Sequence, residues 1–162
     1  MIIYHGGFSE VRFPKILEPK RTLDFGFGFY ATTNFNQAKK WALSKKDRFH
    51  YREAIVNFYE VDDSLLRNKE LNCKVFEKPD ENWLDFIVSN RQNIDFSYNY
   101  DIVFGAVAND NVYASINLYE QGFLGKSELL EELVAWKYVD QFCFHSEKSL
   151  GYLHFIKSEE VF

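Results

Sequence analysis

The chain has little cysteine and no metal-binding pattern. Its two cysteines among 162 residues, Cys73 and Cys143, stand far apart and form no C-x-x-C pair. Two isolated thiols provide neither a disulfide framework nor the ligand spacing of a zinc site. His145 and His154 lack the spacing of a metal-binding pair, and His50 stands alone. We therefore predict no metal site and expect a reducing compartment.

The start of the chain also lacks any targeting pattern. The first residues contain neither the basic region of a signal peptide nor an apolar run long enough for a membrane span. We therefore expect a cytoplasmic protein with no membrane partner. The sequence contains three prolines, no internal repeat and no low-complexity segment. A chain of this length corresponds to one domain, which we expect to cover residues 1–162.

An excess of positive charge is absent as well. The net charge at pH 7 is −5, and lysines and arginines are spread along the chain. This distribution gives no global field that would attract a phosphate backbone. Charge therefore does not indicate nucleic acid as a partner, and nucleic acid stays open as a substrate.

Aromatic residues, by contrast, are abundant. They make up 19% of the chain, with 17 Phe and 10 Tyr. Bulky rings must therefore supply much of the hydrophobic core, and most of them are expected to pack rather than to take part in chemistry.

The hydrophobic pattern predicts a mixture of strands and helices. Strands are expected over residues 54–61, 101–107, 142–145 and 153–157, and helices over residues 83–91, 112–120 and 127–138. Gly122 is expected to end the second of these helices. Strands and helices follow one another in irregular order, without the steady alternation of a doubly wound sheet. The sequence therefore predicts an α+β fold.

One further helix has a start signal of its own. Asn34 is expected to cap it, and Gln37, three residues later, completes a capping box. Ala38, Trp41 and Ala42 then share one helical face.

Two polar segments are interpreted as connections. Pro14–Arg21 is expected to be a loop, and Asn109–Asn111 a turn in which Asp110 is a turn former. A calcium-binding loop that begins at Asp110 is excluded because its twelfth position is Gln121 rather than the required glutamate.

Three short segments, far apart in the chain, have the order expected of one nucleotide-binding site. They are Tyr4-His5-Gly6, the run Gly26-Phe27-Gly28-Phe29-Tyr30 followed by Trp41, and Asp140-Gln141-Phe142. They resemble the three motifs of the ADP-ribosyltransferase superfamily, in the branch of the poly(ADP-ribose) polymerases and diphtheria-type toxins. The whole chain looks like an uncharacterised bacterial family within it. The resemblance implies NAD as the substrate and small mixed or antiparallel sheets in a split core flanked by helices.

The first motif pairs a histidine with a glycine. By resemblance, His5 bonds the adenosine ribose of NAD, and the backbone of Gly6 holds the nicotinamide amide, where a side chain would crowd the approach. The alternative interpretation is a histidine at a strand end beside a flexible Gly6-Gly7 turn.

The second motif is a glycine-rich turn that leads into a strand carrying a tyrosine. By resemblance, Tyr30 stacks on nicotinamide and Trp41 closes the other side of the ring. A positively charged ring between two aromatic faces gains ~1–2 kcal/mol from cation–π attraction when it is desolvated. The alternative is that both rings belong to the core. A Rossmann fingerprint is rejected, because Lys20–Asp24 is too polar for a buried strand and the helix begins only near Asn34.

Gln141 stands where the third motif normally has a catalytic glutamate. Its amide accepts a hydrogen bond from the nicotinamide-ribose 2′-hydroxyl but brings no negative charge. The resemblance therefore implies transfer of a single ADP-ribose rather than extension of a polymer. The missing negative charge would then come from Glu147, from Asp110 or from an acid that the sequence does not place. The alternative is that Gln141 is only a polar residue at the entry of a strand.

A local basic stretch offers two interpretations. It consists of Lys39, Lys40, Lys45, Lys46 and Arg48. These side chains either meet a pyrophosphate or an acidic acceptor, or they form a solvated helix face.

These features support three hypotheses. The first is an NAD-dependent mono-ADP-ribosyltransferase in which His5, Tyr30 and Gln141 are catalytic, and His5, Gly6, Tyr30 and Trp41 bind NAD. Its acceptor is a macromolecule or small molecule that the sequence does not identify. The second keeps the fold and predicts an NAD glycohydrolase or a catalytically silent NAD-binding module. The third, based on the aromatic surplus, is a partner-binding protein without a nucleotide site.

Overall fold

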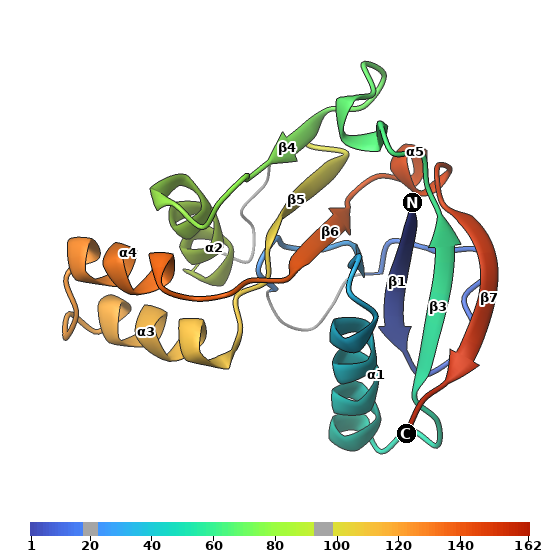
Figure 1. The fold of residues 1–162 in the computed structure, drawn as a ribbon, viewed down its shortest axis with the longest axis horizontal. Helices are drawn as coiled ribbons and strands as arrows, with labels where there is room; N and C mark the ends of the chain where they lie inside the picture. The colour runs from blue at the N-terminus through green and yellow to red at the C-terminus, as the bar shows by residue number, and fades with distance from the viewer. Residues whose placement is uncertain (18–22, 93–98) are drawn as a thin grey trace.

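The computed structural model describes residues 1–17, 23–92 and 99–162, which form two small sheets (Figure 1). One sheet is antiparallel with the order β1-β3-β7, namely Ile2–Gly7, Ile55–Glu60 and His154–Glu160. The other has the order β2-β6-β5-β4, namely Phe29–Ala31, Asp140–Phe144, Ile102–Ala106 and Cys73–Val75. In this second sheet β4 and β5 run parallel and the other neighbours run antiparallel.

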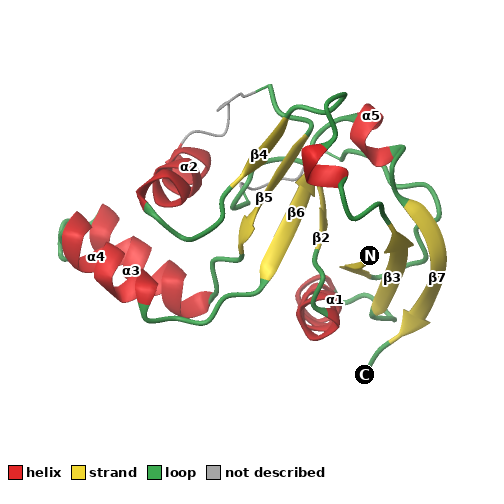
Figure 2. Cartoon of the chain, turned by 45° about the horizontal axis from the view of Figure 1, so that its top comes forward, coloured by secondary structure: helices red, strands yellow, loops and turns green. Residues whose placement is uncertain are grey.

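Helices flank both sheets (Figure 2). They are α1 (Phe35–Phe49), α2 (Glu81–Gln92), α3 (Asp110–Glu120), α4 (Lys126–Val134) and α5 (Glu147–Leu150), with a 3₁₀ turn at Leu65–Arg67. Within the described ranges, none of these helices has the length and apolarity needed to cross a bilayer. Small mixed and antiparallel sheets with flanking helices confirm the predicted α+β class.

The two sheets meet where β1 passes β2. The amide of Tyr4 donates to the carbonyl of Thr32 at 2.8 Å, and the amide of Thr32 donates back to the carbonyl of Tyr4 at 3.0 Å. Strand β1 otherwise pairs with β3, and β2 pairs with β6. This bridge therefore brings the first two sequence motifs side by side, although they belong to different sheets.

Side-chain alternation along the strands separates two parts of the interior. In β6, Phe142 and Phe144 join a core that residues of both sheets share, whereas Cys143 on the other face joins the residues of α2, α3 and α4. Strand β2 follows the same rule, because Phe29 faces the shared core and Tyr30 faces the helices. A third cluster packs α1 on the three-stranded sheet and consists of Ala38, Ala42, Ala54, Val56 and Val161.

Aromatic rings supply much of these cores, as the composition predicts. The largest fully buried side chains include Trp83, Tyr59, Phe25, Phe142 and Phe144. The small alanines of α1 have a different consequence, because they let this helix approach the backbone of β1 closely.

Most of the predicted elements are confirmed. Strands β3, β5, β6 and β7 and helices α2 and α3 lie on the predicted segments. The Asn34 side chain accepts from the amide of Gln37 at 3.0 Å, which confirms the helix cap. The expected capping box is not formed, because the amide of Asn34 donates to Thr32 Oγ1 at 3.0 Å rather than to the Gln37 side chain. Gly122, with φ of 80°, follows the end of α3. The expected loop Pro14–Arg21 is described only as far as residue 17, and residues 18–21 lie outside the described residues.

Two predictions near α3 and α4 are wrong. Asn109–Asn111 is not an isolated turn, because the Asn109 side chain accepts from the amides of Asn111 and Val112 and caps α3. Asp110 is consequently the first residue of that helix. Helix α4 ends at Val134 rather than at residue 138, and the Tyr138 hydroxyl donates to the carbonyl of Leu133 at 2.6 Å beyond its end.

The segment after the third motif leads from one sheet to the other. The segment after β6 contains the short helix α5, which Ser146 begins with a capping box. Strands β6 and β7 lie in different sheets and therefore do not pair with each other.

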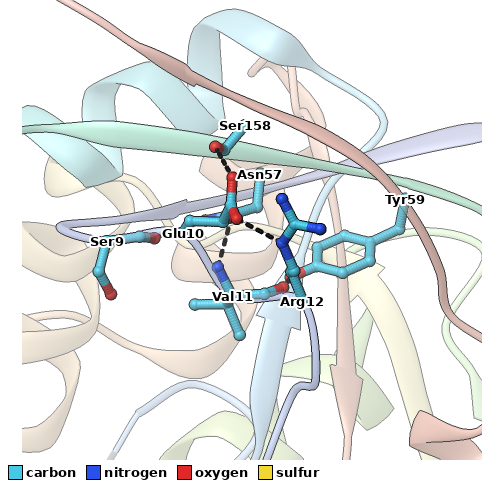
Figure 3. A network of polar contacts seen from close by, with 7 residues as sticks. All are labelled: Ser9, Glu10, Val11, Arg12, Asn57, Tyr59 and Ser158. Atoms are coloured by element: carbon cyan, nitrogen blue, oxygen red, sulfur yellow. Dashed lines mark hydrogen bonds and ion pairs between the residues drawn. The ribbon is translucent and has the colours of Figure 1, made fainter.

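A buried asparagine holds the segment that follows β1 (Figure 3). Asn57 of β3 is fully buried, accepts from the amide of Val11 at 2.8 Å and donates to the carbonyl of Ser9 at 3.0 Å. Above it, Glu10 accepts from Arg12 at 2.5 Å and from Ser158 at 2.6 Å. These contacts fix the exit of the chain from β1, which carries the first motif.

Asn57→Ala tests this anchor. The substitution leaves the amide of Val11 and the carbonyl of Ser9 without their side-chain partner, so we expect the free energy of unfolding to fall by about 2–4 kcal/mol. Ser158→Ala, which removes only an exposed hydrogen bond to Glu10, should cost less than about 1 kcal/mol. Urea denaturation of both variants measures the difference, and equal losses would contradict an anchoring role for Asn57.

Candidate functional site

The residues that the motifs single out line one cleft of about 600 Å³. His5, Gly6, Tyr30, Trp41 and Gln141 are all among its walls. Its remaining lining comes from α1, from the start of α3, from Arg91 of α2 and from residues 23–24 and 107–108. The structure therefore brings together side chains that are as far apart in sequence as β1 and β6.

Strand geometry accounts for how these side chains reach the cleft. Tyr30 and Gln141 lie on neighbouring strands β2 and β6, and each has its side chain on the helix-facing side of the sheet. His5 and Gly6 arrive from β1 through the bridge to β2. Trp41 comes from α1, whose Ala38 and Ala42 are buried against the three-stranded sheet.

His5 is held as a neutral imidazole. Its Nδ1 lies 2.6 Å from the carbonyl oxygen of Tyr30 and must carry the proton, because a carbonyl only accepts. The ring stacks on Phe29 with centroids 4.1 Å apart. Burial, and then the positive charge of Lys45, lower the pKa of His5 to about 3. In this tautomer Nε2 is a hydrogen-bond acceptor, which suits a hydroxyl donor such as a ribose.

Gly6 is required for the packing of α1, a reason that the sequence did not indicate. A β-carbon at this position would lie 2.0 Å from the carbonyl oxygen of Ala38 and 2.9 Å from the amide of Ala42. The space for a side chain at Gly6 is therefore occupied by the backbone of α1. The Lys45 ammonium donates to the carbonyl of Gly6 at 2.7 Å and further ties α1 to this strand.

Tyr30 fixes the glycine-rich turn. Its hydroxyl donates to the carbonyl of Gly26 at 2.7 Å and accepts from the amide of Phe25 at 3.0 Å. Gly26 has φ of 80°, a conformation that favours glycine. Tyr30 and Trp41 are both half-buried at the cleft, so Trp41 is not one of the fully buried core rings of the alternative interpretation.

The amide of Gln141 has a determined orientation. Its Nε2 donates to Oδ2 of Asp24 at 2.9 Å and to the carbonyl of Ala106 at 3.2 Å. Both N–H groups of the amide are used by these acceptors, so Oε1 is left as the accepting end. Gln141 is only 2% exposed and lies within β6, so it is more than a polar residue at a strand entry.

Asp24 is the acid that sequence reasoning did not place. It is 6% exposed, lines the cleft, and accepts hydrogen bonds from Gln141, from the amide of Ala108 and from the Tyr113 hydroxyl. Burial raises its pKa to about 6, although Gln141, Ala108 and Arg91 each oppose that rise. The sequence shows only an aspartate before a glycine-rich turn, a pattern that does not distinguish it from a loop residue.

The other candidate acids are placed differently. Glu147 is exposed on α5 and is not part of the cleft wall. Asp110 lies at the rim of the cleft, where it forms an exposed ion pair of 3.8 Å with Lys40. Asp24 is therefore the acid in contact with Gln141, and Glu147 and Asp110 are not.

Positive charges line one side of the cleft. Lys40, Lys45 and Arg48 reach it from α1, and Arg91 reaches it from α2. The guanidinium of Arg91 lies 4.5 Å from the ring centroid of Tyr113, which in turn donates to Asp24. Part of the basic stretch of α1 therefore faces a cavity, which a purely solvated face would not do.

Gly6→Ala tests the close approach of α1. The added β-carbon overlaps helix backbone that cannot move independently, so we expect a loss of about 3 kcal/mol in the free energy of unfolding. Gly125→Ala is a matched control, because its β-carbon would have no neighbour nearer than 3.8 Å, and it should cost less than about 1 kcal/mol. Thermal and urea unfolding measure both variants. A Gly6→Ala protein of wild-type stability would show that α1 does not pack on β1 in this way.

Asp24→Asn tests the raised pKa of the buried carboxyl. The folded protein binds this proton more tightly than the unfolded chain does, so wild-type stability falls relative to Asp24→Asn as the pH rises from about 4 to about 6. Raising the pKa from 3.8 to about 6 corresponds to roughly 3 kcal/mol at most. Tyr30 and Cys143, which face Asp24, stay neutral there because their pKa values are raised by burial. Urea denaturation of both proteins between pH 4 and pH 7 gives the difference, and a constant difference would contradict the assignment.

Comparison with known proteins gives a family and no relative of known activity. No curated protein and no solved structure matches the chain. The family described as "Protein of unknown function (DUF3990)" matches residues 1–155, which is nearly the whole sequence. The chain therefore belongs to the DUF3990 family.

Proposed function

We propose that the protein is an NAD-dependent mono-ADP-ribosyltransferase with an ADP-ribosyltransferase-like fold. One observation carries the proposal: the motif residues His5, Gly6, Tyr30, Trp41 and Gln141 come from distant segments and line a single cleft. The cleft volume of about 600 Å³ lies within the range of small-molecule sites, about 300–1,000 Å³.

The side chains of the cleft fit the parts of NAD. Nε2 of His5 is an acceptor for a hydroxyl of the adenosine ribose, and Oε1 of Gln141 is an acceptor for a hydroxyl of the nicotinamide ribose. Tyr30 and Trp41 offer two aromatic faces to the cationic nicotinamide ring. The backbone N–H and C=O of Gly6 point away from β3. Those of Tyr4, two residues earlier on the same strand, point the same way and bond Thr32.

The charges of the cleft fit the pyrophosphate. Lys40, Lys45 and Arg48 lie together on α1 and present ammonium and guanidinium groups to the cleft. Such groups bind the oxygens of a pyrophosphate by charge-assisted hydrogen bonds. The aromatic, hydroxyl-accepting and cationic surfaces thus match the nicotinamide ring, the ribose hydroxyls and the pyrophosphate of one dinucleotide.

The proposed reaction transfers one group. The nicotinamide–ribose bond breaks with its electron pair passing to the ring nitrogen, and the ribose carbon becomes electron-poor. An oxygen or nitrogen of the acceptor forms the new bond and releases its proton to water. The protein's residues place the reactants and stabilise the developing positive charge.

A second candidate function has an observation of its own. Gln141, an amide, replaces the glutamate that would activate an acceptor, which favours an NAD glycohydrolase or a binding module of the same fold. Nicotinamide release distinguishes these functions. Release that depends on added cell lysate supports transfer, release in buffer alone supports hydrolysis, and NAD binding without release supports a silent module.

Trp41→Ala tests the aromatic wall of the cleft. Losing one ring face from a cationic nicotinamide should raise the Kd for NAD about 10-fold, since the contact contributes ~1–2 kcal/mol. Phe49→Ala is the matched control, because Phe49 is an exposed ring on the same helix and is not part of the cleft wall. Calorimetric titration with NAD measures both variants. Equal affinity of the two variants for NAD would show that Trp41 is not part of the site. A wild-type protein that does not bind NAD would support the third hypothesis, a partner-binding protein without a nucleotide site.

A further inference from the structure

Asp24 and Gln141 are in contact. Gln141 stands where the third ADP-ribosyltransferase motif has a glutamate, and Asp24 places a buried carboxyl group directly beside its amide. Oδ2 of Asp24 accepts from Nε2 of Gln141 at 2.9 Å, and the two side chains belong to segments far apart in the sequence. Both are nearly inaccessible to solvent and both line the cleft. The pair therefore presents one accepting oxygen to the cleft with a carboxylate directly behind it.

We propose that Asp24 supplies, through Gln141, the negative charge that the reaction needs. The two residues together then replace the single glutamate of the motif. This inference rests on the proposed NAD-cleaving function. Gln141 holds the ribose hydroxyl through Oε1, and Asp24 is a positioning residue that fixes the amide and polarises it.

The electrostatic reasoning has two parts. An amide whose N–H donates to a carboxylate carries more negative charge on its oxygen, because hydrogen bonds in series polarise one another. The carboxylate also acts directly on the positive charge that develops at the ribose carbon, and such attraction is strong in a site that excludes water. Neither effect requires Asp24 to touch the substrate.

The surroundings of Asp24 permit it to be ionised near neutral pH. Donors reach it from Gln141 of β6, from the amide of Ala108 and from Tyr113 of α3. Arg91 of α2 adds a positive charge and stacks on Tyr113. The other titratable groups that face it or the same cleft are Tyr30, Cys143, His5, Lys40, Lys45, Arg48 and Asp110. Against these, burial alone keeps its pKa at about 6, so the carboxylate form predominates above that pH.

The same contacts explain why a glutamine stands at position 141. Its Nε2 lies between two acceptors, Oδ2 of Asp24 and the carbonyl of Ala106. A glutamate would place an oxygen there, against a carboxylate and a carbonyl, and the two carboxylates would repel each other unless one of them kept a proton. Gln141 is therefore the residue that fits beside a buried aspartate.

Asp24→Asn removes the charge with little other change. An asparagine oxygen in the place of Oδ2 keeps the bonds from Gln141 and Ala108, and its amide in the place of Oδ1 donates to the Tyr113 hydroxyl, which rotates to accept. We expect nicotinamide release to fall about 10- to 100-fold, with the Kd for NAD changed less than about threefold. In the wild type, kcat/KM should rise with pH through about 6, and in Asp24→Asn this rise should be absent.

Gln141→Glu gives the opposing test. If the glutamine merely lacked a charge, this variant would release nicotinamide faster than the wild type. The Asp24 pairing predicts slower release and a lower Tm, because two carboxylates face each other. Glu147→Gln removes an exposed acid outside the cleft and is the control for a general change of charge, with release expected at the wild-type rate.

The outcomes separate this inference from the proposed function. A wild type that releases nicotinamide, together with an Asp24→Asn variant that is slower and has lost the pH dependence, supports both. An active wild type with an equally active Asp24→Asn, or a faster Gln141→Glu, overturns the role of Asp24 and leaves the transferase proposal intact. A wild type that neither binds nor cleaves NAD overturns both. Circular dichroism of each variant identifies any loss of folding, and Asp24→Asn decides alone if Gln141→Glu does not fold.

Discussion

The junction between the two sheets is the constraint on which the candidate site depends. The backbone bridge of Tyr4 with Thr32 and the hydrogen bond from His5 to the carbonyl of Tyr30 both cross from β1 to β2. Without that crossing, the first motif would belong to one sheet and the second to another. Because the crossing lies beside the start of β6, Gln141 completes the group, and residues of α1 and of the start of α3 line the rest of the cleft.

Close packing of α1 makes that junction rigid. Ala38 and Ala42 let the helix backbone approach β1. At position 6 of β1, only a glycine leaves room for that backbone. The same helix then presents Trp41 and its basic side chains to the cleft on another face. One element thus closes a core with its small residues and builds a wall of the candidate site with its large ones.

The sequence predicted the parts of this molecule that local patterns encode. The cap at Asn34, the strand from Ile55 to Glu60 and the glycine-rich turn before Tyr30 each follow from neighbouring residues, and the structure contains them. The role of Asp24 could not be predicted, because its partners Ala108, Tyr113 and Gln141 are distant in the chain. For Gly6 the sequence did not indicate the packing reason, since only the fold shows that α1 occupies the space beside it. Asn109 was assigned to a turn because the residues that cap a helix also form turns.

The proposed site is one cleft in which the cationic ring of a dinucleotide lies between Tyr30 and Trp41. The adjoining ribose lies beside Gln141 of β6, which Asp24 of the segment before β2 contacts. A crystal structure of the protein with NAD tests this most directly. We expect the nicotinamide ring to lie against Tyr30 and Trp41, the adenosine ribose at Nε2 of His5, and the other ribose at Oε1 of Gln141. NAD bound on another face of the molecule, or a cleft that stays empty at saturating NAD, would contradict it.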